Sequence, residues 1–260
     1  MARTLAWGLI SLICLCGLQA CRQDPQDKTA DKPAARALAG GVAGGRDLGD
    51  GLQLLTREQR TELQNSKVTI RTARPELVGG DEGVTQAFNQ AMRAFEAEQL
   101  RVFKSDYGAN LREGSMELGY RILHADHRLI SLQFNTSTYT GGAHPNNTSR
   151  AFTFDLQRRA MLNLADLFVA NTDYLQTMAD YCVQAIKDRG ISDDDQIADG
   201  AGARPENYEQ HWNVGPEGLL ITFDAYQVAA YAVGPQEVRI PYAALKEILN
   251  PDGPLSAWSK

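Results

Sequence analysis

Two neighbouring stretches of alternating residues constrain the fold of this chain more than any other feature. The first alternates over residues 116–122 and the second over residues 130–136, and Ala125-Asp126-His127 lies between them. A period of two places every second side chain on one face of a strand, as in a half-buried sheet. Because the connection is short, the strands are expected to pair as an antiparallel β-hairpin. The inward positions are Met116, Leu118, Tyr120, Ile122, Ile130, Leu132, Phe134 and Thr136.

The rest of the chain alternates between strand-like and helix-like segments. Apolar residues recur at helical spacing in residues 82–102 and between Asn171, the expected N-cap, and Gly190. Residues 193–206 predict a polar loop, and residues 241–250 predict a terminal helix. Further strands are expected at residues 66–77, 151–156, 218–223, 228–233 and 238–240. This order predicts an α+β fold with a mainly antiparallel sheet and three to four helices.

Composition and charge narrow the classes of function. The 260 residues are 43% apolar and 22% charged, which is typical of a globular protein. The chain holds 26 Lys and Arg against 32 Asp and Glu, a formal net charge of −6. Because a nucleic-acid-binding domain normally carries a basic face, no nucleic-acid partner is expected. An acidic surface is compatible with a cationic partner.

The N-terminal residues predict export and lipid attachment. Arg3 precedes an uncharged run that ends at Ala20, and its apolar core is shorter than the roughly 20 residues that span a bilayer. This is the plan of a secretory signal peptide over residues 1–20. Leu18-Gln19-Ala20-Cys21 resembles the lipobox of bacterial lipoproteins, which implies acyl chains on Cys21 and a membrane anchor. The alternative is an ordinary signal peptide, with Cys21 as a plain thiol.

The residues after Cys21 extend this expectation. By resemblance to enterobacterial sorting, Arg22 favours the outer membrane, with the protein facing the periplasm. Residues 21–51 lack aromatic side chains and are expected to form a flexible tether. Once the other cysteines are removed or acylated, Cys182 remains, so no disulfide within the chain is expected. Its place on an apolar helix face predicts an inert core thiol.

The segment Tyr139-Thr140-Gly141-Gly142-Ala143-His144-Pro145-Asn146-Asn147 is the most distinctive in the chain. Gly141 and Gly142 permit positive φ, and Pro145 restricts the backbone of His144. A histidine held on such a turn is a candidate general base or metal ligand, or a structural residue bonded to the backbone. No second His or Cys lies at ligand spacing, so neither a metal nor another cofactor is expected. The local signatures of nucleophile elbows, zinc helices and phosphate loops are also missing from the sequence.

An ordered set of motifs carries a resemblance to a known family. The motifs are the Gly-Gly-Ala-His-Pro segment, Phe152-x-Phe154-Asp155, Leu162-x-Leu164-x-Asp166-Leu167-Phe168, Gly218-Leu219-x-Ile221-x-Phe223-x-x-Tyr226-x-Val228-Ala229-x-Tyr231-Ala232-x-Gly234 and Val238-x-Ile240-Pro241-Tyr242. These motifs resemble an uncharacterised cell-envelope domain, which occurs in the extracytoplasmic part of lysozyme-sensing anti-sigma factors and as an accessory domain of some peptidoglycan deacetylases. The resemblance implies two intimately packed lobes, an α/β lobe at residues 52–138 and a second lobe at residues 139–260.

The resemblance implies binding, since neither a sigma-binding segment nor the metal-binding histidines of a deacetylase domain are recognised here. The leading hypothesis is a lipid-anchored periplasmic module that binds a lysozyme-like protein or peptidoglycan without catalysis. Alternatives are an inhibitor or immunity protein against a wall-degrading enzyme, and an envelope hydrolase that uses His144. Aromatic side chains anchor both protein interfaces and sugar faces, although Tyr226 and Tyr231 are alternatively framework residues of the sheet. The candidate contacts are Tyr139, Gly141, Gly142, His144, Tyr226 and Tyr231.

Overall fold

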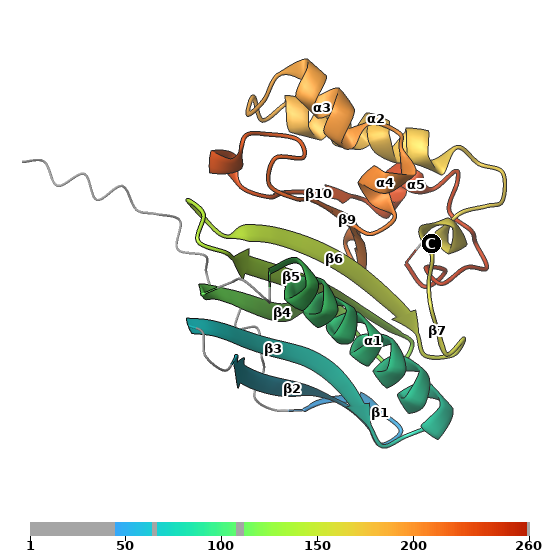
Figure 1. Ribbon diagram of the computed structural model, residues 1–260. Helices are drawn as coiled ribbons and strands as arrows, with labels where there is room; N and C mark the ends of the chain where they lie inside the picture. The colour runs from blue at the N-terminus through green and yellow to red at the C-terminus, as the bar shows by residue number, and fades with distance from the viewer. Residues whose placement is uncertain (1–44, 64–66, 108–111, 259–260) are drawn as a thin grey trace, which may run out of the picture. The chain divides into compact units, whose positions relative to one another are not determined.

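Two β-sheets organise the computed structural model, which describes residues 45–63, 67–107 and 112–258 (Figure 1). The predicted signal peptide, Cys21 and residues 22–44 of the predicted tether lie outside the described residues. The larger sheet has seven strands in the order β1-β2-β3-β4-β5-β6-β7. They are β1 (Arg46–Gly49), β2 (Leu52–Glu62), β3 (Lys67–Val78), β4 (Glu113–Ala125), β5 (Leu129–Tyr139), β6 (Asn146–Asp155) and β7 (Ala160–Met161).

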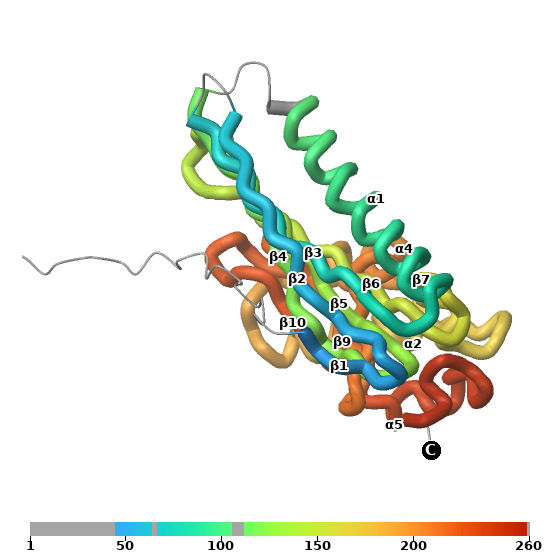
Figure 2. The backbone as a smooth tube through the Cα atoms, turned by 90° about the horizontal axis from the view of Figure 1, so that it is seen from below, coloured from blue at the N-terminus to red at the C-terminus, as the bar shows by residue number. Residues whose placement is uncertain are grey.

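Sheet order and chain order coincide in the larger sheet, and all but one of its strand pairs are antiparallel. The exception is the β3–β4 pair, which is parallel, with Ile70 opposite Met116. Parallel neighbours require a long crossover connection. Helix α1 (Glu82–Tyr107) supplies it and lies along one side of the sheet (Figure 2).

Alternation along the strands explains why α1 packs on one face of the sheet. Phe88 of α1 meets Phe154 of β6 edge-on, with 5.4 Å between ring centroids. Phe95 of α1 lies 4.7 Å from Phe134 of β5. Because successive strand residues point to opposite faces, Ser131, which is out of phase with Phe134, faces away from the helix. The predicted hairpin is confirmed as β4 and β5, and its inward residues form this core.

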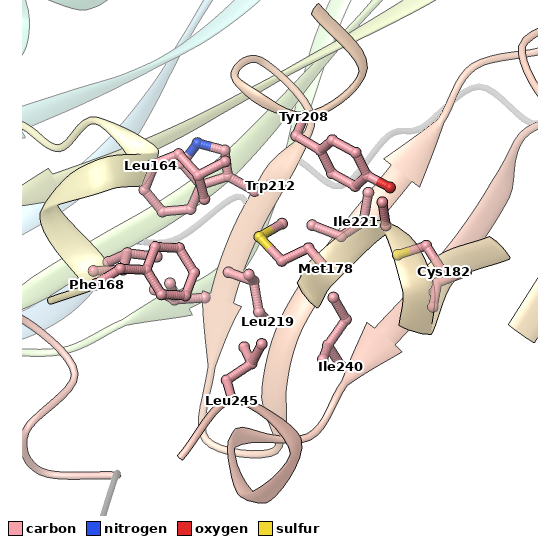
Figure 3. Close-up of a cluster of buried hydrophobic side chains, with 14 of the residues drawn as sticks. Leu164, Phe168, Met178, Cys182, Tyr208, Trp212, Leu219, Ile221, Ile240 and Leu245 are labelled. Atoms are coloured by element: carbon pink, nitrogen blue, oxygen red, sulfur yellow. The ribbon is translucent and has the colours of Figure 1, made fainter. Parts of the chain in front are cut away.

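The second sheet lies on the face opposite α1. It contains β8 (Trp212–Gly215), β9 (Gly218–Phe223) and β10 (Gln236–Ile240), in the antiparallel order β10-β9-β8. Helix α2 (Tyr174–Lys187) packs on it, and Met178 and Cys182 lie in the same core as Ile221 (Figure 3). The other elements are η1 (Leu164–Leu167), α3 (Asp194–Ala201), α4 (Pro205–Tyr208), η2 (Tyr231–Val233) and α5 (Tyr242–Leu245).

A buried polar seam joins the two sheets. The Ser131 side chain of β5 is fully buried, and its Oγ accepts hydrogen bonds from the Asn213 Nδ2 and the Val214 backbone N, each at 3.0 Å. The Thr153 Oγ1 lies 3.1 Å away. Since both acceptor positions of the Ser131 hydroxyl are used, its proton goes to Thr153. The Asn213 Nδ2 also donates to the Leu132 carbonyl at 2.9 Å, so β8 is fixed directly on β5.

The folded region begins earlier than the sequence predicts. Residues 46–49, assigned to the tether of residues 21–51, form β1, with Arg46 opposite Leu54 of β2. Gly49, Asp50 and Gly51 all have positive φ, which permits the tight reversal between the strands. The predicted division between residues 138 and 139 falls at a hairpin within the larger sheet, because β5 and β6 pair along their lengths.

The α+β class and mainly antiparallel pairing are confirmed, but several local predictions are wrong. Helix α2 is capped by Asp173, whose side chain accepts from the Gln176 N, and Asn171 precedes it with a φ of 63°. The polar loop predicted at residues 193–206 contains α3 and α4, so the described residues hold five α-helices. Asp193 caps α3, and Pro205 begins α4 with a preset φ.

The strand predicted at residues 228–233 is also absent from the structure. Backbone donors within this segment and on either side of it close turns instead: the Gln227 N bonds to the Asp224 O, the Val233 N to the Ala230 O, and the Gly234 N to the Tyr231 O. Val228 and Ala229 are nevertheless buried, which accounts for the apolar pattern. No helix within the described ranges combines the length and apolarity needed to cross a membrane.

Replacing Ser131 with Ala is expected to destabilise the fold by about 1–3 kcal/mol, because it removes the acceptor of the buried Val214 N–H and one of the two acceptors of the buried Asn213 amide. Urea unfolding of the variant, followed by circular dichroism, measures the loss. The matched control is Ser137→Ala on the same strand, where the side chain is only half-buried, and it is expected to be near neutral. Equal stability of the two variants would contradict the role of the seam.

Candidate functional site

Three of the predicted contact residues meet at one end of the two sheets. His144 lies in the β5–β6 connection, and Tyr226 and Tyr231 lie in the β9–β10 connection. The His144 and Tyr231 rings stack with 4.0 Å between centroids and 21° between planes. The Tyr226 and Tyr231 centroids are 5.2 Å apart at 33°. We call His144, Tyr226 and Tyr231 the aromatic trio; the two connections that carry it lie one above the other at the left of Figure 1.

The β5–β6 connection holds His144 in place through its own backbone. Gly141 has a φ of 88°, which a residue with a side chain rarely adopts, so it permits the sharp turn after β5. The Pro145 carbonyl accepts hydrogen bonds from the His144 Nδ1 at 2.9 Å and from the Tyr231 Oη at 3.2 Å. The predicted turn with a backbone-bonded histidine is therefore present, and it also binds the second connection.

The members of the aromatic trio differ in exposure. Tyr231 is half-buried and contacts both other rings, whereas His144 is exposed. Tyr226 is 60% exposed, which is the highest exposed fraction among the exposed large hydrophobic residues of the described segments. The aromatic trio therefore presents the ring of Tyr226 to solvent, with Tyr231 as its support.

A carboxylate clamp, formed by Asp224 and Ser149, ties the β9–β10 connection to β6. Asp224, at the start of the β9–β10 connection, accepts from the Ser149 backbone N at 3.0 Å and from the Ser149 Oγ at 2.6 Å. Ser149 lies on β6, close after His144. A carboxylate that accepts two such bonds holds Ser149 more firmly than a neutral acceptor would. The clamp is formed by residues 75 apart in the chain, and no local motif in the sequence predicts it.

The remaining predicted contacts lie outside the aromatic trio. Tyr139 ends β5 opposite Ser115 of β4, and among the described residues no ring contact joins it to the trio. Gly141 and Gly142 are exposed in the turn, where they shape the backbone. Within the described part of the chain, no group of three or more His, Cys, Asp or Glu side chains is arranged to hold a metal ion.

Cys182 of α2 is buried in the core between α2 and the second sheet (Figure 3). Burial raises the pKa of the Cys182 thiol to about 12, because the thiolate is poorly solvated there. The thiol therefore stays protonated at neutral pH and is unreactive. This agrees with the core position predicted from the helical spacing.

His211 lies beside the clamp, immediately before β8. Burial lowers the pKa of His211, and the charge of Arg150 lowers it further, while Asp224 opposes both effects. Its Nδ1 is buried and has no hydrogen-bond partner among the described residues. The neutral form is thus the one that the folded protein accommodates.

The stability of the protein is expected to fall as the pH is lowered through the range below the ordinary histidine pKa of about 6.5. The folded state binds fewer protons at His211 than the unfolded state there, so acid favours unfolding. His211→Gln is expected to reduce this decline, measured by urea unfolding at pH 7.5 and pH 5.0. The exposed His127→Gln is the control, and an equal decline in both variants would exclude the effect.

Comparison with known protein families gives two matches, one after the other along the chain. Residues 59–147 match the family described as Deacetylase PdaC, and residues 165–243 match the family described as Protein of unknown function (DUF3298). The first match ends just after His144, and the second includes Tyr226 and Tyr231. The aromatic trio therefore joins residues from both matched regions.

The match to each of two curated relatives covers less than half of that relative. The peptidoglycan-N-acetylmuramic acid deacetylase PdaC of Bacillus subtilis is 26% identical over 208 residues, covering 74% of this chain and 44% of the relative. The immunogenic protein MPT64 of Mycobacterium tuberculosis is 31% identical over 109 residues, covering 42% of this chain and 47% of the relative. This chain thus spans less than half the length of these curated relatives.

Solved structures show the same fold. A DUF3298 family protein from Pseudomonas aeruginosa PAO1 has a TM-score of 0.59 at 17% identity, covering 79% of this chain and 96% of the other. A member of the same family from Bacteroides fragilis has a TM-score of 0.58 at 17% identity, covering 80% and 96%. The chain therefore combines a PdaC-related region with a DUF3298-related region, on a fold shared with structures of the DUF3298 family.

Proposed function

We propose that this chain is a binding module of the cell envelope, which recognises the glycan of peptidoglycan through the aromatic trio and performs no catalysis of its own. The observation that carries the proposal is the exposed ring of Tyr226, held by contact with Tyr231. The relationship to a peptidoglycan deacetylase supports the choice of ligand.

The chemistry of the site fits a saccharide. One face of a sugar ring presents C–H groups, which pack on an aromatic ring, while its hydroxyl groups need polar partners at the edge. The β5–β6 connection supplies exposed polar backbone beside the trio, at residues 140–144. A ring such as Tyr226 loses little conformational entropy on contact, since few bonds rotate in its side chain.

The surroundings of His144 favour binding over hydrolysis. Its Nδ1 donates to the Pro145 carbonyl and its ring is stacked on Tyr231. Among the described residues, no carboxylate is hydrogen-bonded to His144 to orient it as a general base. We therefore assign His144 the role of a support for Tyr231.

A lysozyme-like protein is the second candidate ligand, favoured by the net charge of −6. Opposite charge on a cationic partner accelerates encounter and improves complementarity. Such a partner would use the same exposed ring, because aromatic side chains are typical anchors of protein interfaces. The two ligands are therefore compared in one experiment.

Tyr226→Ala is expected to weaken binding of soluble peptidoglycan fragments at least tenfold, because the exposed contact face is lost. Isothermal titration calorimetry with residues 45–260 measures the affinity, and lysozyme is titrated in parallel. The matched control is Tyr181→Ala, another exposed tyrosine, on α2. Unchanged affinity in Tyr226→Ala, or no saturable binding of either ligand to the wild type, would refute the proposed site.

We further propose that the module is anchored by acyl chains on Cys21 to the outer membrane, on its periplasmic side. The support is the sequence Leu18-Gln19-Ala20-Cys21 followed by Arg22. Several acyl chains on one residue give stable anchoring, since each buried CH₂ contributes about 0.8 kcal/mol.

Cys21→Ser is expected to abolish acylation and to lower the share of the protein in the membrane fraction, because the thioether-linked chains have no sulfur to attach to. Membrane fractionation with immunoblotting measures the distribution, and labelling with radioactive palmitate measures acylation. Cys182→Ser is the control and is expected to keep both. A Cys21→Ser protein that remains acylated and membrane-bound would disprove the anchor.

A further inference from the structure

The backbone of Tyr226 is held in an unfavourable conformation. Its φ is 72°, in the left-handed region that residues with a side chain rarely adopt. Such conformations persist only where the surroundings fix them, and they are concentrated at functional sites. The surroundings that fix Tyr226 are therefore part of what makes its ring available.

Helix α3 provides the first of these constraints. The Gln196 Nε2 donates a hydrogen bond to the Tyr226 carbonyl at 3.0 Å. Gln196 is itself fixed, because the Asp193 side chain accepts from its backbone N and the Ser192 Oγ donates to its Oε1, both at 2.9 Å. The amide that binds the Tyr226 backbone thus belongs to the capped first turn of a helix.

The second constraint is the next residue of the loop, Gln227. Its Nε2 donates to the Gly200 carbonyl of α3 at 3.0 Å, and its Oε1 accepts from the Asp224 backbone N at 3.0 Å. The contact between the two backbones is very close: a Cβ on Gly200 would lie 1.8 Å from the Gln227 carbonyl oxygen. Only glycine at position 200 allows α3 to lie against the loop in this way.

We propose that α3 is the positioning element of the ligand site, and that Gln196 and Gly200 set the affinity for ligand by fixing the Tyr226 ring on its exposed side. This inference rests on the proposed function for its ligand. Neither residue touches the ligand: Gln196 acts through the Tyr226 carbonyl and Gly200 acts through Gln227. The short helix from Asp194 to Ala201 therefore contributes to recognition from behind the loop.

Two variants test the proposal. Gln196→Glu keeps the size of the side chain but has a carboxylate that cannot donate to the Tyr226 carbonyl. It is expected to weaken binding of soluble peptidoglycan fragments at least fivefold. Gly200→Ala forces the loop away from α3 and is expected to weaken binding at least tenfold. The matched control is Gly215→Ala, at the turn between β8 and β9 and outside the site, where the nearest heavy atom to an added Cβ is 4.0 Å away; its affinity is expected to be unchanged.

A second measurement, made without ligand, separates this proposal from the proposed function. Ring stacking shifts the proton resonances of Tyr226, Tyr231 and His144, so NMR spectra report the position of the trio directly. Both α3 variants are expected to change these shifts while the thermal unfolding transition stays cooperative. Gln196→Asn is expected to change the shifts as well, because its shorter side chain does not bring the amide to the Tyr226 carbonyl.

The outcomes are distinct. If the wild type binds no fragment but the α3 variants move the ring resonances, the proposed ligand is wrong and the positioning role stands. If the wild type binds, and both variants keep its affinity and its ring resonances, the positioning role is overturned. If Gly200→Ala does not fold, Gln196→Glu decides the question alone by the same two measurements.

Discussion

The buried hydroxyl of Ser131 is the contact on which the arrangement of this protein most depends. Ser131 accepts from Asn213 and Val214 and donates to Thr153, so one side chain joins two strands of the larger sheet to β8. A hydrophobic interface would tolerate sliding, because apolar contact is non-directional. Hydrogen bonds at a buried site are directional, and an unmade one is costly. The seam therefore fixes the register of one sheet on the other.

The aromatic trio, which is the proposed ligand site, depends on that register. His144 lies in a connection of the larger sheet, whereas Tyr226 and Tyr231 lie in a connection of the smaller sheet. The 4.0 Å stacking of His144 on Tyr231 therefore requires the two sheets to be correctly docked. The clamp between Asp224 and Ser149 secures the same junction at its solvent end. Each connection alone presents flexible side chains on a loop. Together they hold the three rings in contact, and in the proposed function such a preformed platform would bind with less further ordering.

The sequence singled out the three residues of the aromatic trio but not the residues that hold them together. His144 was identified from Gly-Gly-Ala-His-Pro, and the two tyrosines from the pattern between β9 and β10. Asp224, Ser149, Gln196 and Gly200 were missed, because their roles arise from contacts between segments remote in the chain. The strand predicted at residues 228–233 failed for a related reason. Buried apolar residues in a turn resemble those in a strand, and only the partners of their backbone groups distinguish the two.

By itself, the sequence determined the local periodicities: the β4–β5 hairpin, α1, α2, and the α+β class that follows from their order. These features depend on the spacing of apolar side chains within one segment, which the chain displays directly. Tertiary structure alone decided that β3 and β4 pair in parallel, that residues 193–206 hold two helices, and that three aromatic rings meet. Each of these results depends on which distant groups contact one another, and those contacts form only when the whole chain has packed.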